Sequence, residues 1–382
     1  MTDATESVEA DASLTAEKGA VEHYPIDSLL IRSETRSVVD VIRRIQKKTF
    51  VLDPEFQRDF LWDEYLQSRL VESVLMRIPL PVFYIAESKS GSLIVVDGLQ
   101  RLTTLSRFYA GELTLSLPDN PELNGLVYST LPQRLRDRFE DGQLVFFIVD
   151  PKVPERVRLD IFERVNSGRP LTRQQMRNAI YSGDATKLLK ELAMSTDFRE
   201  ATGGALSSDT HRKEMDDREA INRVIAFMLV GWKSYTKTIT YDEFLGSTLA
   251  KLNARAEKDP SWLAKLRGAF LRSMRINRAL FGRHAFRKFA LNEERQRPLN
   301  LALLDTLGST LSVYDEAKAI SKGKLLKKGL ANLMKDSDFM TAISRGTLWH
   351  DNVRTRFSGV SDLVLDTLGE PSNVDYLVPE QG

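Results

Sequence analysis

The residues best suited to chemistry lie where a short apolar stretch meets a helical repeat. Residues 93–96 are apolar throughout, and Asp97, Gly98, Gln100 and Arg101 follow them. Glycine has no Cβ, so the backbone can turn sharply there and approach a ligand closely. The first turn of a helix also exposes unpaired N–H groups at the positive end of its dipole. This combination predicts an anion site that suits a phosphate group.

Neighbouring side chains would add specific contacts to such a site. Arg101 can form a bidentate contact with phosphate oxygens, and Thr103 and Thr104 supply hydroxyls. Asp97 could bind Mg²⁺ directly or through water. The same spacing also fits an aspartate that caps an ordinary helix, with Arg101 facing solvent, because Asp-Gly is common in turns. Spacing alone favours that ordinary cap, and the chain has neither a Walker A motif nor a glycine-rich dinucleotide fingerprint.

Hydrophobic periodicity predicts which elements position these residues. It predicts strands at 82–85, 93–96 and 144–149, and helices at 37–46, from 63, from 99 to Gly111, at 154–165 and from 172. Later in the chain it predicts helices at 218–232, 241–258, 260–278, 298–320 and 323–334, without a convincing strand. The fold class is therefore α+β, with a mixed α/β domain followed by an all-helical domain.

Length and composition set the broader limits. The chain has 382 residues, 42% hydrophobic and 28% charged, which is typical of a globular protein with two domains. We expect a disordered acidic tail at 1–22, the mixed α/β domain at 23–185 and the helical domain at 186–382. The absence of cysteine excludes disulfides, cysteine zinc sites and thiol nucleophiles. With no long apolar run and no signal-like terminus, we expect a cytoplasmic protein without a membrane partner.

Several sequence blocks stand in a fixed order around the predicted site. They are residues 54–58, 62, 70–75, 78–81, 96–105, 162–168, 171–172 and 176–179. Together they resemble the amino-terminal domain of GmrSD-type restriction endonucleases, over roughly residues 24–185. The resemblance implies a ParB/sulfiredoxin-like fold. It also implies a nucleotide-binding module used in bacterial defence against phage or modified DNA.

The resemblance further implies which residues form the site. It locates the phosphates of a nucleoside triphosphate near four residues of the turn, and a loop and a helix end would contribute to the same pocket. The turn residues are Asp97, Gly98, Gln100 and Arg101; the loop residues are Gln57 and Arg58; the helix end has Asn166 and Gly168. Asn166 and Gly168 could equally just end their helix. Asp97, Gln100 and Arg101 would be the catalytic candidates, with Asp97 as the ligand of Mg²⁺. Leu99 stands where the family usually has glutamine, which removes an amide donor and acceptor and leaves hydrolysis open.

Two other sequence features bear on nucleic-acid chemistry. Larger family members carry an HNH nuclease domain, but His350-Asp351-Asn352 is the nearest approach here and lacks the second histidine. The segment 265–297 is basic and interleaved with phenylalanines, and its candidate DNA-binding residues are Arg272, Arg275, Arg278, Arg283, Arg287 and Lys288. The alternative for this segment is an amphipathic helix pair with core phenylalanines and arginines paired with acids. That alternative is the favoured one.

The first functional hypothesis is a Mg²⁺-dependent nucleotide-binding NTPase or switch module, with a base that the sequence does not specify. It would couple nucleotide state to DNA or to a partner nuclease or other defence subunit. The second hypothesis is a non-catalytic DNA-binding or adaptor protein with the same fold. A direct nuclease of the ParB-like kind ranks third.

Overall fold

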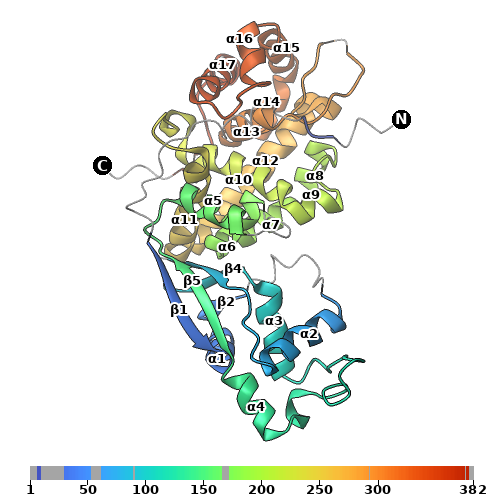
Figure 1. Cartoon of the computed structure of the whole chain (residues 1–382). Helices are drawn as coiled ribbons and strands as arrows, with labels where there is room; N and C mark the ends of the chain where they lie inside the picture. Colours follow the sequence, from blue (N-terminus) through green and yellow to red (C-terminus); the bar gives the residue numbers. More distant parts are fainter. Residues whose placement is uncertain are drawn as a thin grey trace. The chain divides into compact units, whose positions relative to one another are not determined.

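The chain folds into two compact units. Figure 1 shows the computed structural model with most of its helices and strands labelled. The structure describes residues 7–9, 30–52, 62–88, 91–165, 172–291, 293–374 and 376–377. One unit is His23–Ile180 and the other combines Met1–Glu22 with Tyr181–Gly382. A mixed sheet in the first unit and helices in the second confirm the predicted α+β class.

The first unit is built on a five-stranded sheet with the order β1-β5-β3-β4-β2. Its strands are β1 (Ile31–Ser37), β2 (Phe50–Val51), β3 (Phe83–Glu87), β4 (Leu93–Asp97) and β5 (Gln143–Val149). Strand β1 pairs antiparallel with β5, β5 parallel with β3, β3 antiparallel with β4, and β4 parallel with β2. The three predicted strands are confirmed, and β1 and β2 are additional.

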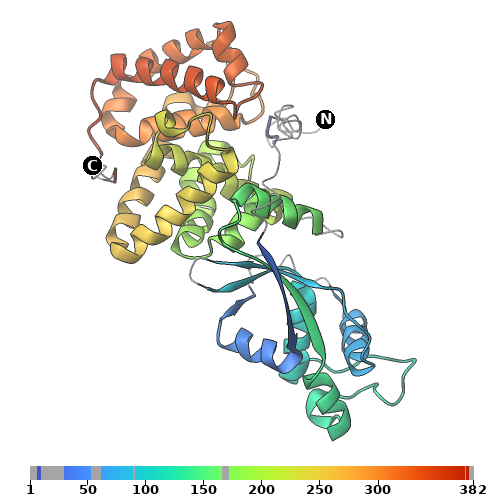
Figure 2. The same cartoon turned by 60° about the vertical axis from the view of Figure 1, so that its left-hand side comes forward.

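Helices cover both faces of this sheet, as the apolar character of β4 requires. Leu93 and Val95 join one hydrophobic core, while Ile94 and Val96, which point to the opposite face, are also buried. The first core includes residues of the four helices on its side of the sheet: α1 (Val38–Gln46), α2 (Glu64–Leu75), α3 (Leu99–Tyr109) and α4 (Gln133–Glu140). Two helices pack against β3 or β4 on the other side: α5 (Glu155–Val165) and α6 (Arg173–Ile180). Figure 2 shows the two groups on opposite sides of the strands.

Local capping signals explain where these helices begin. Ser37 caps α1, and the Asp63 carboxylate accepts a hydrogen bond from the Leu66 amide at 2.8 Å at the start of α2. Thr172 and Gln175 form the predicted capping box, with side chain-to-backbone hydrogen bonds of 2.7 and 3.2 Å. The starts of these three helices are therefore specified by ordinary cap chemistry.

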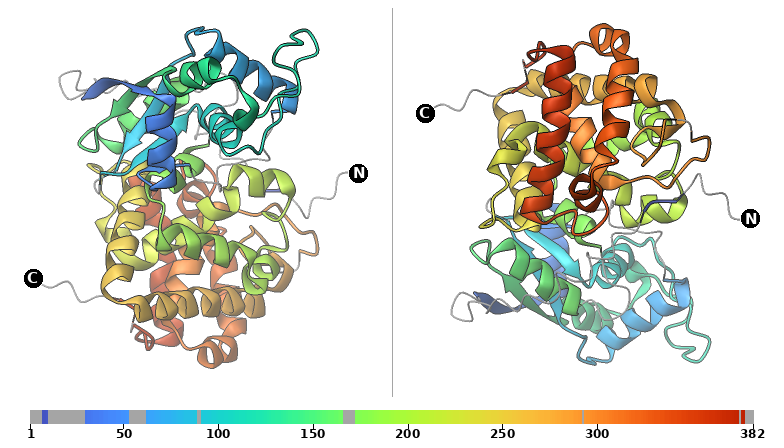
Figure 3. Two further views of the ribbon diagram at one scale, coloured as in Figure 1. Left: turned by 90° about the horizontal axis from the view of Figure 1, so that it is seen from below. Right: turned by 90° about the horizontal axis from the view of Figure 1, so that it is seen from above.

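The second unit is helical throughout its described elements. These are α7 (Asp184–Met194), α8 (Thr196–Thr202), α9 (Asp209–Glu214), α10 (Asp216–Val230), α11 (Tyr241–Lys258), α12 (Pro260–Phe281), α13 (Leu301–Thr310), α14 (Glu316–Ser321), α15 (Gly323–Leu333), α16 (Ser337–Ala342) and α17 (His350–Leu368). Figure 3 shows them from two opposite directions. The helix predicted over 298–320 is wrong, because it is divided into α13 and α14, and Asp315 caps the second piece. No helix in the described part of the chain is long and apolar enough to cross a membrane.

A buried ionic group joins three helices of this unit. Asp305 on α13 is fully buried and accepts hydrogen bonds from Arg223 on α10 at 2.8 Å and from Arg356 on α17 at 3.2 Å. Arg356 also donates to the hydroxyl of Thr306 at 3.0 Å and to the carbonyl of Thr347. Removing Asp305 would leave two buried cations without their carboxylate, so this group specifies how the three helices meet.

Three residues of the expected disordered tail, Ser7–Glu9, are ordered against the helical unit. We call them the N-terminal arm. The Leu299 amide donates to the carbonyl of Ser7 at 3.0 Å, and the Glu9 amide donates to the carbonyl of Leu299 at 2.7 Å. The Glu9 carboxylate pairs with Lys288 and accepts from the Asn300 amide at 2.9 Å. Polar composition did not reveal this contact, because it depends on a partner almost 300 residues away in sequence.

Candidate functional site

The junction of β4 and α3 is a sharp turn centred on Gly98. Gly98 is the N-cap residue of α3 with φ +95°, a conformation that L side chains rarely adopt. A Cβ at this position would lie 2.2 Å from Cδ1 of Phe83, which is completely buried. Glycine is therefore required by both the backbone conformation and the close approach of the Phe83 ring.

Arg101 lies beneath this turn and binds protein acceptors. Its Nη1 donates to the carbonyl of Pro81, and its Nη2 donates to the carbonyl of Val82 at 3.1 Å and to Asp97 Oδ2 at 2.9 Å. The guanidinium also lies over the Phe83 ring, 4.3 Å from its centre. Burial is the main influence on the pKa of Arg101 and lowers it, while the charge of Asp97 opposes this shift.

These contacts change the interpretation of Arg101. Only 9% of the residue is exposed, so the solvent-facing arginine of the ordinary-cap reading is wrong. Both hydrogens of Nη2 have acceptors in the protein, and either bidentate edge of a guanidinium uses Nη2. A bidentate phosphate contact is therefore blocked in this conformation, and Arg101 acts as a positioning residue for the turn.

Asp97 does not cap α3. No side chain of the described residues accepts from the first-turn amides of this helix at its N-cap, and Asp97 instead pairs with Arg101. Its side chain is 32% exposed, so the carboxylate remains accessible from outside the turn. The described residues contain no cluster of three or more acidic or histidine side chains that could hold a metal. An accessible carboxylate is a ligand type that Mg²⁺ accepts, and most of the other ligands of such an ion would have to come from outside these side chains.

One side of α3 carries polar atoms that lack a partner. Gln100 Oε1, Thr103 Oγ1 and Ser106 Oγ are buried, and none has a hydrogen-bond partner in the described part of the structure. Their three-residue spacing places them along one face of the helix. Thr104 differs, because it is fully buried and its hydroxyl donates to the carbonyl of Gln100 at 2.8 Å.

The remaining predicted residues of this site are distributed differently. Leu99 packs against the hydrophobic core of the unit, which explains an apolar residue at this position of the motif. Gln57, Arg58, Asn166 and Gly168 lie outside the described residues. Phe83 was not predicted, although it supports both Gly98 and Arg101; an aromatic residue in a strand gives no sequence signal that separates such a role from ordinary core packing.

The six basic residues proposed for DNA contact do not form one exposed surface. Arg287 is 1% exposed and donates to the carbonyls of Ala285 and Thr202, and Lys288 is 9% exposed and pairs with Glu9. The side chains of Arg272, Arg275 and Arg278 bind, respectively, the carbonyl of Ser312, Asp197 with Glu316, and Glu200. Arg283 is exposed. The four phenylalanines of the segment are buried: Phe270, Phe281, Phe286 and Phe289. This arrangement favours the amphipathic alternative.

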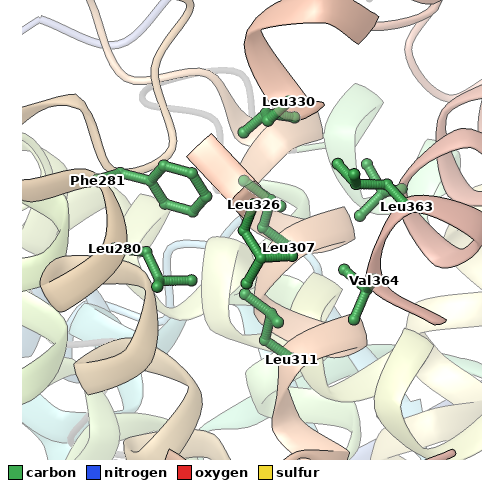
Figure 4. Close-up of a pocket in the computed structure, with 9 residues that line it drawn as sticks. Leu280, Phe281, Leu307, Leu311, Leu326, Leu330, Leu363 and Val364 are labelled. Atoms are coloured by element: carbon green, nitrogen blue, oxygen red, sulfur yellow. The ribbon is translucent and has the colours of Figure 1, made fainter. Parts of the chain in front are cut away.

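Two further places in the helical unit lack the features of a catalytic site. Asn352 donates from its side chain to the carbonyls of Arg345 and Gly346 at 2.8 and 3.0 Å, so it fixes the loop before α17. The cavity in Figure 4 is lined only by leucine, valine and phenylalanine side chains, such as Leu307, Leu326 and Val364. An apolar cavity without polar groups offers no catalytic chemistry.

Comparison with known proteins addresses the β4–α3 turn directly. Residues 38–182 match the family described as GmrSD restriction endonuclease, N-terminal domain. The match contains β4, the turn at Gly98, α3 and α6. A search of curated proteins found no match to the chain. The match confirms the resemblance seen in the motifs: residues 38–182 are similar to the GmrSD restriction endonuclease N-terminal domain.

Proposed function

We propose that residues 38–182 form a nucleotide-phosphate-binding module of a restriction-type defence protein. The observation that carries this proposal is the start of α3, where a positive-φ glycine leaves the first-turn amides without a side-chain cap. Gln100 and Thr103 offer buried polar atoms without partners beside these amides. Amide groups at the positive end of a helix bind phosphate well. The family match supports the restriction context.

Each residue then has a defined task. The amides of the first turn of α3 bind phosphate oxygens, and the Thr103 hydroxyl donates to the same ligand. Gln100 Oε1 is an acceptor, so it binds a donor of the ligand or a water molecule. Arg101 holds Asp97 and the carbonyls of residues 81 and 82, and thereby keeps the turn in its binding geometry. Asp97 supplies one carboxylate to a phosphate-bound Mg²⁺ ion, which neutralises phosphate charge. The helical unit transmits nucleotide state to DNA or to a partner nuclease.

A matched pair of substitutions tests the binding role of α3. Thr103 and Thr104 are neighbours of the same type, but only Thr104 uses its hydroxyl within the helix. We expect Thr103→Val to weaken binding of a nucleoside triphosphate with Mg²⁺ by about tenfold, as measured by calorimetry. Thr104→Val should leave that affinity unchanged. Equal affinities of Thr103→Val and the unmodified protein would contradict the proposal.

A further inference from the structure

Helix α6 is unusually polar for its burial. All residues from Gln174 to Ile180 are buried, and the two amide side chains at Gln174 and Asn178 are 1% and 0% exposed. Buried polar side chains in folded proteins normally find hydrogen-bond partners. This group does not follow that pattern.

Several polar atoms of the group remain without partners. They are Gln174 Nε2, Asn178 Nδ2 and Asn178 Oδ1, none of which has a hydrogen-bond partner among the described residues. The other end of the Gln174 amide is fixed, because Arg177 Nη1 donates to Gln174 Oε1 at 3.0 Å. Gln174 and Asn178 are one helical turn apart and share a face of α6. The Gln174 Nε2 donor and the whole Asn178 carboxamide are therefore buried without a hydrogen-bond partner among the described residues, so both are available to a ligand.

The position of α6 connects this group with the phosphate site. Helix α6 packs against β4, and β4 ends at Asp97, directly before the turn at Gly98. A five-residue strand is about 17 Å long. The part of β4 that contacts α6 is therefore separated from the turn at Gly98 by no more than the length of this strand. The ligand of the turn could extend along that distance.

The chemistry of the free atoms indicates the part of the ligand that they bind. A carboxamide presents a donor and an acceptor side by side, and nucleobases present matching adjacent acceptors and donors on their edges. A single side-chain carboxamide carries no net charge, whereas the first turn of α3 presents several N–H donors at the positive end of the helix dipole and therefore favours phosphate. The two groups are thus suited to opposite ends of one nucleotide.

We propose that Gln174 and Asn178 form the nucleobase subsite of the nucleotide site. This inference rests on the proposed function of the α3 turn. It assigns selectivity for the base to α6 and leaves phosphate binding to α3. A nucleoside triphosphate would contact both the α6 amides and the first turn of α3, while inorganic tripolyphosphate would contact only the first turn of α3.

The test compares these two probes on the full chain by calorimetry in the presence of Mg²⁺. Asn178→Leu keeps a similar volume and removes both amide atoms. We expect it to weaken binding of the preferred nucleoside triphosphate by about tenfold and to leave the affinity for tripolyphosphate unchanged. Gln174→Met serves as a second variant and should have the same selective effect.

A matched control comes from the helical unit. Asn222 on α10 is also fully buried with both amide atoms unpartnered among the described residues, but it stands outside the α6 group. Asn222→Leu should leave both affinities unchanged. If Asn178→Leu and Gln174→Met bind the nucleotide as the unmodified protein does, the amides are satisfied by internal water and the base subsite is refuted. If the unmodified protein binds neither probe, the phosphate site itself is wrong, and the base subsite falls with it.

Discussion

The guanidinium of Arg101 lies 4.3 Å from the centre of the Phe83 ring, and Gly98 passes over the same ring so closely that no Cβ fits. Strand β3 thus forms the support for a turn between β4 and α3. Arg101 links this support to Asp97 through a 2.9 Å hydrogen bond. The Phe83 ring and the Arg101 side chain therefore fix the conformation of the turn at the candidate site.

Replacing Arg101 should therefore affect the fold more than a ligand contact would. Arg101→Met keeps much of the aliphatic stem but leaves two carbonyls and Asp97 without their donors. We expect the α/β unit to lose about 3 kcal/mol of unfolding free energy. Urea denaturation measures the loss, and hydrogen exchange locates it at residues 81–105. Arg134→Ala, at an exposed position of α4, is the control and should change little. A fully stable Arg101→Met protein would show that Arg101 does not position the turn.

Alanine substitutions at two glycines with similar backbone conformations distinguish the cost of backbone strain from the cost of steric crowding by Phe83. Gly98 has φ +95° and touches Phe83, whereas Gly111 has φ +79° and no atom within 4 Å of an added Cβ. Gly111→Ala should cost about 1 kcal/mol from backbone strain alone. Gly98→Ala should cost about 2 kcal/mol more, because the ring must move as well. If urea denaturation gave the same loss of unfolding free energy for both variants, the Phe83 ring would move aside without an energetic cost.

The N-terminal arm should stabilise the helical unit through one charge. Lys288 is largely buried, and Glu9 is the carboxylate that pairs with it. Glu9→Gln should lower the unfolding free energy by about 2 kcal/mol, because the ammonium group loses its counter-charge. Adding Lys288→Met removes that unpaired charge and should recover most of the loss.

An exposed ion pair of the same unit provides the control. Lys237 and Asp351 lie 3.2 Å apart with side chains 70% and 75% exposed. Asp351→Asn should change stability by less than about 1 kcal/mol. If Glu9→Gln had an equally small effect, the arm would not contribute to the stability of the unit.

A buried carboxyl at the start of α10 should make stability depend on pH. Asp217 is 6% exposed, and burial raises its pKa from 3.8 to about 6, although the Arg218 amide donates to it at 2.8 Å. The folded state therefore retains the proton that the unfolded state releases, and stability falls as pH rises from about 4 to about 6. The loss attributable to Asp217 is about 3 kcal/mol. Asp217→Asn should remove this part of the pH profile in denaturation experiments. A profile that the substitution leaves unchanged would show that the Asp217 carboxyl is ionised in the fold.

Sequence reasoning predicted the elements with clear local signals. Helix α11 begins and ends where periodicity predicted, because a capping box at Thr240 and Glu243 marks its start. Strand β1 was missed, since Ile31–Ser37 is mostly polar and its strand conformation depends on pairing with β5. Helix α17 was not predicted either. The side chains that it buries became apparent only from the structure.

The strand-to-helix turn of the candidate site was predicted, but the contacts of its side chains were not. The order of motifs identified the Asp97–Arg101 turn, and the family match confirmed that recognition. The role of Arg101 could not be derived from the sequence, because its acceptors at residues 81 and 82 are backbone carbonyls. Side-chain identity carries no information about a carbonyl acceptor. Of the two buried amides of α6, Asn178 lies within a block of the family resemblance, and Gln174 lies in none.

Nucleotide binding is the central claim, and a nucleotide panel tests it most directly. The full chain would be heated with ATP, GTP, CTP or UTP, each with and without Mg²⁺, and the Tm of the α/β unit recorded. A ligand at one hundred times its Kd stabilises the folded state by about 2.7 kcal/mol. We predict that at least one nucleotide raises the Tm in the presence of Mg²⁺, and that calorimetry detects the same binding. No shift and no binding heat with any of the four would contradict the account.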